Sequence, residues 1–226
     1  MGRGKPREVK RDRRGAGVGV NCQGKLAAAL PDGYTDVQPG KIAAVVTSLA
    51  MFAPPRLRPD PPEAPWRLRR VAEPDVNWFR DLHRRIGEDW LWFSRLMLSD
   101  DALTAIIHDR AIEIYAVEHL GRDAGLLELD FRQQDDCELS FFGLTASLIG
   151  KGAGRWLMNR AFELAWSRPI RRLWVHTCTL DHPQALAFYV RSGFEAFRRQ
   201  IEIADDPRTT GVLPTTAAPG IPIIES

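Results

Sequence analysis

A glycine-rich hexapeptide is the first feature of this chain that could do chemistry. Residues Ile149–Gly154 read Ile-Gly-Lys-Gly-Ala-Gly and open a stretch of helical periodicity. The first N–H groups of a helix lack internal partners and carry a partial positive charge, and glycines let an anion approach them closely. Lys151 and Arg155 can add charge-assisted contacts. The segment therefore predicts a site for a pyrophosphate at a helix N-terminus.

One nucleotide-binding motif can be rejected for this turn, and a second fits it poorly. A P-loop has Lys followed by Ser or Thr after its last glycine, whereas Gly154 is followed by Arg155 and Trp156. A dinucleotide-binding fingerprint needs a third glycine where this chain has Leu157. A purely structural turn remains the alternative to phosphate binding.

A second segment supplies groups that could move protons. Residues Pro183–Ser192 are predicted to be a short helix, with Pro in its first turn and Gly193 at its C-terminal stop. Tyr189 lies on this helix, and Glu138 and Glu128 lie in two preceding strand-like stretches. A phenol can donate a proton and a carboxylate can accept one, directly or through water. Simple core packing is the alternative for the tyrosine.

Hydrophobic periodicity predicts the elements that hold these residues. The order is strand, two helices, three strands, helix, strand, helix, strand. The three successive strands have short polar connections and form an antiparallel meander. The expected class is α+β, with a mixed, mostly antiparallel twisted sheet flanked by helices. The ranges are strand 66–71, helices 73–90 and 99–108, strands 112–117, 127–131 and 137–144, helix 152–166, strand 173–179, helix 183–192 and a final strand region 194–203.

At this spacing and in this order, the glycine turn and the Tyr189 helix resemble the acyl-CoA signature of the GNAT superfamily of N-acetyltransferases. The family pattern Gln/Arg-x-x-Gly-x-Gly/Ala fits Gly152-Ala153-Gly154, with Ile149 where Arg or Gln is usual. The resemblance covers residues 66–203. It implies a V-shaped splay between the fourth and fifth strands of the predicted order, and acetyl-CoA as a co-substrate bound in that cleft.

The resemblance also implies roles for individual residues. Glu138 matches the glutamate that deprotonates the amine, and Tyr189 matches the acid that protonates the departing thiolate. Gly143 is expected to permit a bulge that splays its strand. The implied cofactor-binding residues are Leu144, whose N–H polarises the thioester carbonyl, the turn residues Lys151, Gly152, Ala153, Gly154 and Arg155, and His182, where the family often has Asn. His182 could equally be an ordinary residue at the start of a helix.

Acetyl transfer to an alkylamine needs two proton movements. The ammonium, of pKa ~10, must lose its proton before attack, and the leaving thiolate, of pKa ~8.5, is helped by a donor. Glu128 is the rival to Glu138 as base, with Asp130 or a water chain as a further option. Cys178 shares a strand face with His176, which makes an acyl-cysteine route conceivable, although a strand cysteine is usually an inert core residue.

Composition limits the other functions. The 226 residues include 31 basic and 29 acidic side chains, so nucleic-acid binding is not indicated. The three cysteines lack a C-x-x-C pair, which predicts no metal site and a reducing, cytoplasmic location. The longest apolar run, Ile42–Ala53, is shorter than the ~20 residues that span a bilayer, so no membrane partner is expected.

The chain divides into four predicted parts. Residues 1–29 are expected to be a disordered, basic and glycine-rich tail. Residues 30–65 are expected to form an N-terminal extension that packs outside the domain, followed by a proline-rich linker. Residues 66–204 are the predicted N-acetyltransferase domain, and residues 205–226 are a C-terminal tail.

The function implied by the resemblance is acetyl-CoA-dependent N-acetylation of a primary amine by direct attack in a ternary complex. The alternative is a non-catalytic acyl-CoA-binding or scaffold protein with the same fold. The expected acceptor is a small-molecule or peptide amine, and a homodimer is one of the assemblies left open. Residues 88–93, which contain Trp90 and Trp92, are expected to shape the acceptor pocket.

Overall fold

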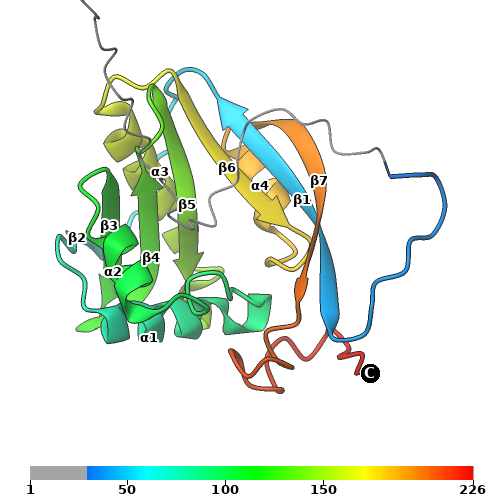
Figure 1. Ribbon diagram of the computed structural model, residues 1–226. Coiled ribbons are helices and arrows are strands. Elements are labelled where there is room, and N and C mark those ends of the chain that lie inside the picture. Colours follow the sequence, from blue (N-terminus) through cyan, green and yellow to red (C-terminus); the bar gives the residue numbers. More distant parts are fainter. Residues whose placement is uncertain (1–29, 226) are drawn as a thin grey trace, which may run out of the picture. The chain divides into compact units, whose positions relative to one another are not determined.

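The computed structural model describes residues 30–225 (Figure 1). The tail predicted over residues 1–29 lies outside the described residues. Residues 30–36 form no helix or strand, and the compact unit described below begins at Val37.

Within residues 30–225, seven strands form one mixed sheet in the order β2-β3-β4-β5-β6-β1-β7. Neighbouring strands are antiparallel except β5 and β6, which run parallel. The predicted α+β class and the β3-β4-β5 meander are confirmed. The bounds are β1 Lys41–Met51, β2 Arg67–Arg70, β3 Ile112–His119, β4 Arg122–Asp130, β5 Asp136–Leu144, β6 Arg172–Cys178 and β7 Glu195–Asp205.

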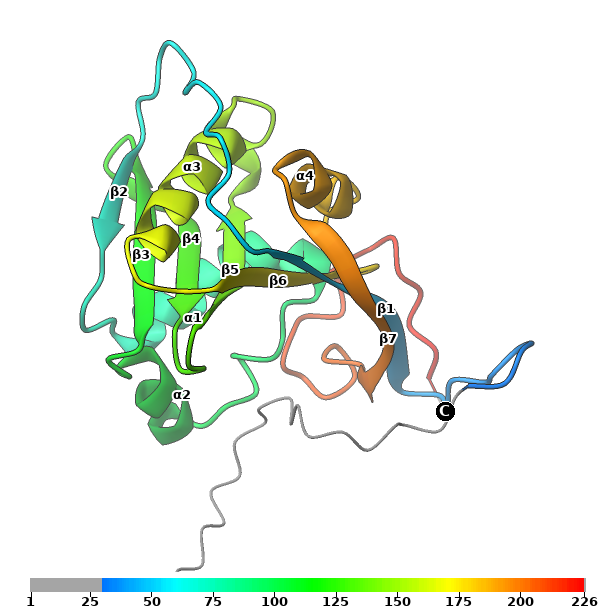
Figure 2. The same cartoon turned by 90° about the horizontal axis from the view of Figure 1, so that it is seen from above.

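The helices cover both faces of the sheet (Figure 2). Ile114 and Leu126 pack in a cluster with α1 and α2, whereas Tyr115 and Leu127 pack in a cluster with α3 and α4. Among residues 30–225, no helix is long and apolar enough to cross a membrane. The bounds are α1 Val76–Gly87, η1 Glu88–Trp90, α2 Asp100–Ile107, η2 Ala146–Leu148, α3 Ala153–Trp166 and α4 Ala185–Arg191.

The segment predicted to pack outside the domain is a strand inside the sheet, so that prediction is wrong. β1 lies between β6 and β7, and Val46 pairs with Cys178 on one side and with Gln200 on the other. Leu49 of this strand is fully buried. Residue preference alone could not show this position, because the pairing partners of β1 lie near the other end of the chain.

The residues after β7, predicted only as a tail, form a third apolar cluster. Arg208 pairs with Asp206, and their side chains are 1% and 3% exposed. The Arg208 guanidinium also donates to the Ile221 carbonyl at 2.7 Å. Leu213 packs in the same cluster as Leu91, which follows η1. The C-terminal residues thereby support the loop between α1 and α2.

Candidate active site

β5 and β6 separate after a short parallel contact, which confirms the predicted splay. Their register pairs are Asp136 with Arg172, Cys137 with Leu173 and Glu138 with Trp174. Beyond these, β5 continues to Leu144 and β6 to Cys178 (Figure 1). We call this divergence the splay, and Glu138 marks its apex.

The bulge in β5 lies at Ser140 and not at Gly143, so the predicted position was wrong. The register between β4 and β5 shifts across Ser140, which becomes the extra residue, whereas Gly143 pairs regularly with Leu126. Gly143 has a different requirement, because a Cβ there would lie 2.6 Å from Cη2 of Trp92. The glycine therefore makes room for an indole on the α1–α2 side of the sheet.

The far end of β5 presents backbone groups to the splay. The Thr145 N–H donates to the Ala124 carbonyl at 2.9 Å, toward β4. Because successive residues of a strand direct these groups to alternate sides, the N–H and C=O of Leu144 point toward the splay, and those of Phe142 do the same. β6 has already diverged here, so these groups are available to a ligand.

The glycine turn begins α3. Gly150 and Gly152 have φ values of +79° and +87°, a conformation that favours glycine. Gly152 is the N-cap residue, and no side chain caps the helix. Lys151 and Arg155 are exposed on either side, whereas Ala153 is buried. The first N–H groups of α3 thus retain their capacity to bind an anion.

The proline-rich segment, residues 54–65, lies along α3 (Figure 2). A Cβ on Gly152 would lie 2.9 Å from Cγ of Pro61, so the proline ring packs directly on the start of the helix. The buried Asn159 of α3 donates to the Asp60 carboxylate at 2.6 Å. The predicted linker is therefore extended but held against the helix that carries the glycine turn.

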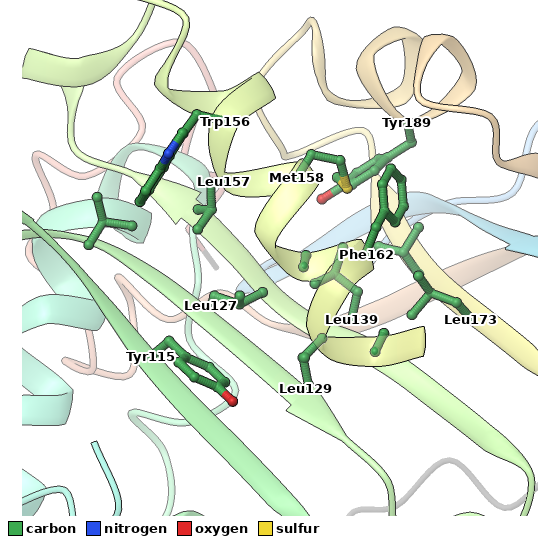
Figure 3. Close-up of a cluster of buried hydrophobic side chains, with 14 of the residues drawn as sticks. Tyr115, Leu127, Leu129, Leu139, Trp156, Leu157, Met158, Phe162, Leu173 and Tyr189 are labelled. Atoms are coloured by element: carbon green, nitrogen blue, oxygen red, sulfur yellow. The ribbon is translucent and has the colours of Figure 1, made fainter. Parts of the chain in front are cut away.

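Tyr189 lies in the core beside α3. It is 7% exposed, and its ring centroid is 6.3 Å from that of Phe142 and 5.9 Å from that of Phe194. Figure 3 shows the ring within the same cluster as Met158. Burial, followed by the nearby charge of Asp181, raises the pKa of the phenol. The hydroxyl therefore keeps its proton at neutral pH, the state that a proton donor requires.

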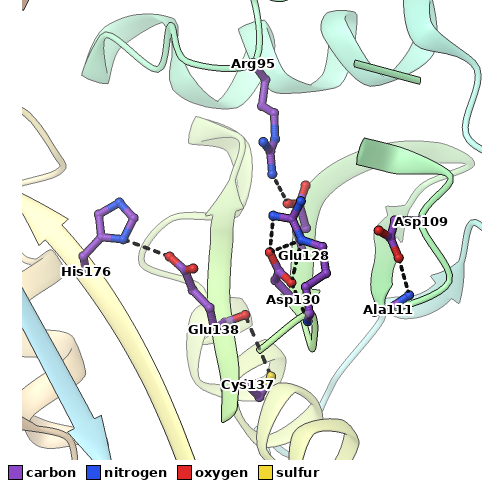
Figure 4. A network of polar contacts seen from close by, with 9 residues as sticks. Arg95, Asp109, Ala111, Glu128, Asp130, Cys137, Glu138 and His176 are labelled. Carbon is purple, nitrogen blue, oxygen red and sulfur yellow. Dashed lines mark hydrogen bonds and ion pairs between the residues drawn. The ribbon is translucent and has the colours of Figure 1, made fainter. Parts of the chain in front are cut away.

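Three carboxylates lie together on the sheet face covered by α1 and α2 (Figure 4). Glu128 and Asp130 are two residues apart on β4, and Asp130 pairs in register with Glu138 of β5. Glu128 is fully buried against Arg95, and burial raises its pKa while the arginine opposes the rise. Asp130 pairs with Arg132 at 2.5 Å. Two of the three carboxylates are thus neutralised by arginines.

Glu138 has a partner of another kind. Its Oε1 lies 3.1 Å from Nδ1 of His176 on β6, and the two side chains are 21% and 48% exposed. The hydrogen bond to Glu138 raises the pKa of His176, against the opposing effect of burial. Of the three carboxylates, the one at the apex of the splay is therefore linked to a titratable imidazole.

The loop after α1 reaches across to the turn after β6. The Trp92 indole donates to the Asp181 carboxylate at 3.1 Å, and the Trp90 ring lies 5.0 Å from that of His182. Nδ1 of His182 also accepts the Gln184 N–H at 3.1 Å. The predicted cofactor residue His182 therefore contacts the acceptor-side loop and the start of α4. Asp181 was missed in the sequence, although an Asp before a turn often binds nearby backbone groups.

A surface hollow of about 420 Å³ lies elsewhere on the molecule. It is at the β2–β3 edge, beside Arg69, Glu118 and Asp123, and β4 separates it from β5. None of the predicted site residues lines it. The hollow is therefore separate from the splay.

Comparison with known proteins identifies the family. The model of the acetyltransferase (GNAT) family matches residues 76–194, which include α1, the splay, the glycine turn and Tyr189. This chain belongs to the GNAT family. Membership supports an acetyl-transfer role. No protein with a curated description matches the chain.

Solved structures support the GNAT fold. A GCN5-related N-acetyltransferase from Sphaerobacter thermophilus is 14% identical, with a TM-score of 0.53, over 74% of this chain and 52% of that one. An acetyltransferase of the GNAT family from Novosphingobium aromaticivorans is 19% identical, with a TM-score of 0.50, over 74% and 68%. The chain thus spans about half to two thirds of these relatives, and the likeness concerns the fold.

Proposed function

We propose that this GNAT protein transfers an acetyl group from acetyl-CoA to a primary amine by direct attack in a ternary complex. The observation that carries the proposal is the position of the splay. The glycine turn and Tyr189 lie on the α3–α4 side of the sheet, and the Glu138–His176 pair lies on the other side. Acetyl-CoA and an amine can therefore approach the same opening from opposite faces.

The turn suits the pyrophosphate of acetyl-CoA. Uncapped N–H groups at the start of α3 supply the backbone contacts, and Lys151 and Arg155 add charge. The Leu144 side chain lies near Gly154, so the pantetheine arm would begin beside Leu144 and continue along β5. Because the arm is long and extended, we assign Leu144 to the arm. The N–H of Phe142, nearer the apex, is then the donor for the thioester carbonyl.

The chemical step follows from these positions. The ammonium loses a proton to the Glu138–His176 pair, and the amine then attacks the carbonyl carbon. The carbon–sulfur bond breaks and the Tyr189 phenol protonates the thiolate, while the new amide nitrogen releases its second hydrogen as a proton. Phe142 lies beside Tyr189, which supports placing the sulfur at that level of β5. One proton is released in each turnover.

Direct attack is favoured over an acyl-cysteine route. Burial raises the pKa of the Cys178 thiol to about 11, so little nucleophilic thiolate exists at neutral pH. Cys137 and Cys178 are both free thiols, which is consistent with a cytoplasmic location. The acceptor is a small-molecule or peptide amine, and a homodimer remains one option for the assembly.

A thiol-release assay with acetyl-CoA and a panel of amines and peptides tests the proposal. Tyr189→Phe should lower kcat by about 10²-fold or more while acetyl-CoA still raises the melting temperature. Tyr115→Phe is the matched control, because this hydroxyl donates to Glu113 and lies outside the splay. Acetyl-CoA binding without turnover by the wild-type chain would instead support the non-catalytic alternative.

A further inference from the structure

We propose that His176 takes the proton from the substrate ammonium and that Glu138 is a positioning residue that acts through it. This inference rests on the proposed acetyl transfer and gives the two residues of the pair separate roles in deprotonating the amine. His176 was singled out in the sequence only for its place next to Cys178 on a strand face. The structure gives it a different neighbour, the Glu138 carboxylate at 3.1 Å.

The position of His176 follows from the strand register. Glu138 pairs with Trp174, and this is the last pair before the strands diverge. His176 is the next residue on the same face of β6, so it is the first side chain past the apex. Its imidazole is 48% exposed, whereas Glu138 is 21% exposed. The imidazole is therefore the member of the pair that an incoming amine can reach.

The hydrogen bond fixes the tautomer of the imidazole. An ionised carboxylate can only accept, so Nδ1 of His176 carries the hydrogen that is donated to Glu138. Nε2 then has a free lone pair. Proton transfer from the ammonium to Nε2 gives a free amine and an imidazolium that Glu138 stabilises. The exposed ring returns this proton to water after each turnover.

The charged groups around His176 also raise the pKa of its imidazole. They face it from three elements: Glu138 on β5, Asp181 in the turn after β6 and Glu202 on β7. Its own strand contributes the Trp174 ring at 6.1 Å. From β1, its register partner is the uncharged Ser48. The three carboxylates favour the imidazolium. The neutral, proton-accepting ring therefore dominates only above the raised pKa of His176.

The neighbouring carboxylates are poorer candidates for the same task. Glu128 is fully buried and paired with Arg95. Asp130 is almost buried and accepts from the Arg132 backbone N–H as well as from its guanidinium. Both carboxylates are therefore occupied by arginines and shielded from an incoming ammonium. The imidazole is 48% exposed and presents Nε2 to the opening, which suits a general base.

The pH dependence of kcat/KM tests this division of roles. The wild-type value should fall as the pH drops through the raised pKa of His176, because the protonated ring cannot accept a proton. His176→Gln should lower kcat/KM by about 10²–10⁴-fold and remove this acidic limb. Free imidazole should restore part of the rate of His176→Ala. His119→Gln, at the far edge of the sheet, is the matched control and should keep both the rate and the limb.

A second measurement does not depend on turnover. Titration of His176 followed by NMR should give a lower pKa in Glu138→Gln than in the wild type. The inference is overturned if wild-type acetyl transfer occurs and His176→Gln retains the acidic limb, or if Glu138→Gln leaves the His176 titration unchanged. Failure of the wild type to acetylate any amine would instead overturn the proposed function, and this inference with it.

Discussion

Substitution of Gly152 by alanine tests the contact between the proline-rich segment and the start of α3. At φ +87° an alanine is strained by about 1–2 kcal/mol. Its Cβ would also lie 2.9 Å from Cγ of Pro61, and this ring is part of a segment anchored by Asp60 to Asn159. Such overpacking typically lowers the free energy of unfolding by a further ~1–3 kcal/mol.

Gly150 provides a control with the same backbone strain. Its φ is +79°, and a Cβ there would meet nothing within 4 Å. Gly150→Ala should therefore lose only the strain energy, about 1–2 kcal/mol. Gly152→Ala should melt lower than Gly150→Ala by roughly 2–4 °C for each further kcal/mol. Thermal and urea unfolding of the purified variants measure both differences.

A double-mutant cycle isolates the contribution of the proline. Pro61→Ala removes Cγ, so Gly152→Ala should become about 1–3 kcal/mol less destabilising in that background. Pro61→Ala should leave the effect of Gly150→Ala unchanged. Equal losses for the two glycine variants, with no coupling to Pro61, would refute the packing of the proline-rich segment on the helix start.

Three further predictions concern charge and mechanism. Glu128→Gln should lower the free energy of unfolding by up to about 3–5 kcal/mol in urea titrations, because it removes the fully buried partner of Arg95, whose side chain is 14% exposed; a loss below about 1 kcal/mol would argue against this pairing. Cys178→Ala should keep kcat within a few-fold, with intersecting initial-rate plots, whereas loss of activity would indicate an acyl-cysteine route. The Arg208 guanidinium holds the pKa of Asp206 below its ordinary value of 3.8, so the stabilisation is present above that pH and is lost as the pH falls through the lowered value. Below pH 3.8, unfolding of Asp206→Asn should show a weaker acid dependence than that of the wild type, and an identical profile would contradict this prediction.

Local features of the fold and site were predictable from the sequence because short-range chemistry determines them. Gly152 begins α3 because a glycine tolerates the left-handed conformation of its N-cap position. Ser99 begins α2 by accepting the Ala102 N–H, as its residue type predicts. Alternating apolar residues gave the meander, and the family resemblance gave the splay. The roles of Glu138 and Tyr189 stay predictions.

Features that depend on long-range pairing were not predictable. The apolar residues of β1 suit a strand, but nothing local specifies insertion between β6 and β7. The bulge formed at Ser140, since register with β4 and not the nearest glycine determines its place. Arg95 and Glu128 meet only after folding brings the loop over the sheet. Similarly, the Glu138–His176 pair requires the parallel contact of β5 and β6, which no spacing reveals.

Thiol release from acetyl-CoA is the most direct test of the central claim that this GNAT protein acetylates an amine at the splay. We expect amine-dependent release of CoA thiol by the wild-type chain, with one N-acetylated product for each thiol. The rate should fall by about 10²-fold or more in Tyr189→Phe but not in Tyr115→Phe. Saturable binding of acetyl-CoA, with no release above the buffer rate for any amine in the panel, would contradict the claim.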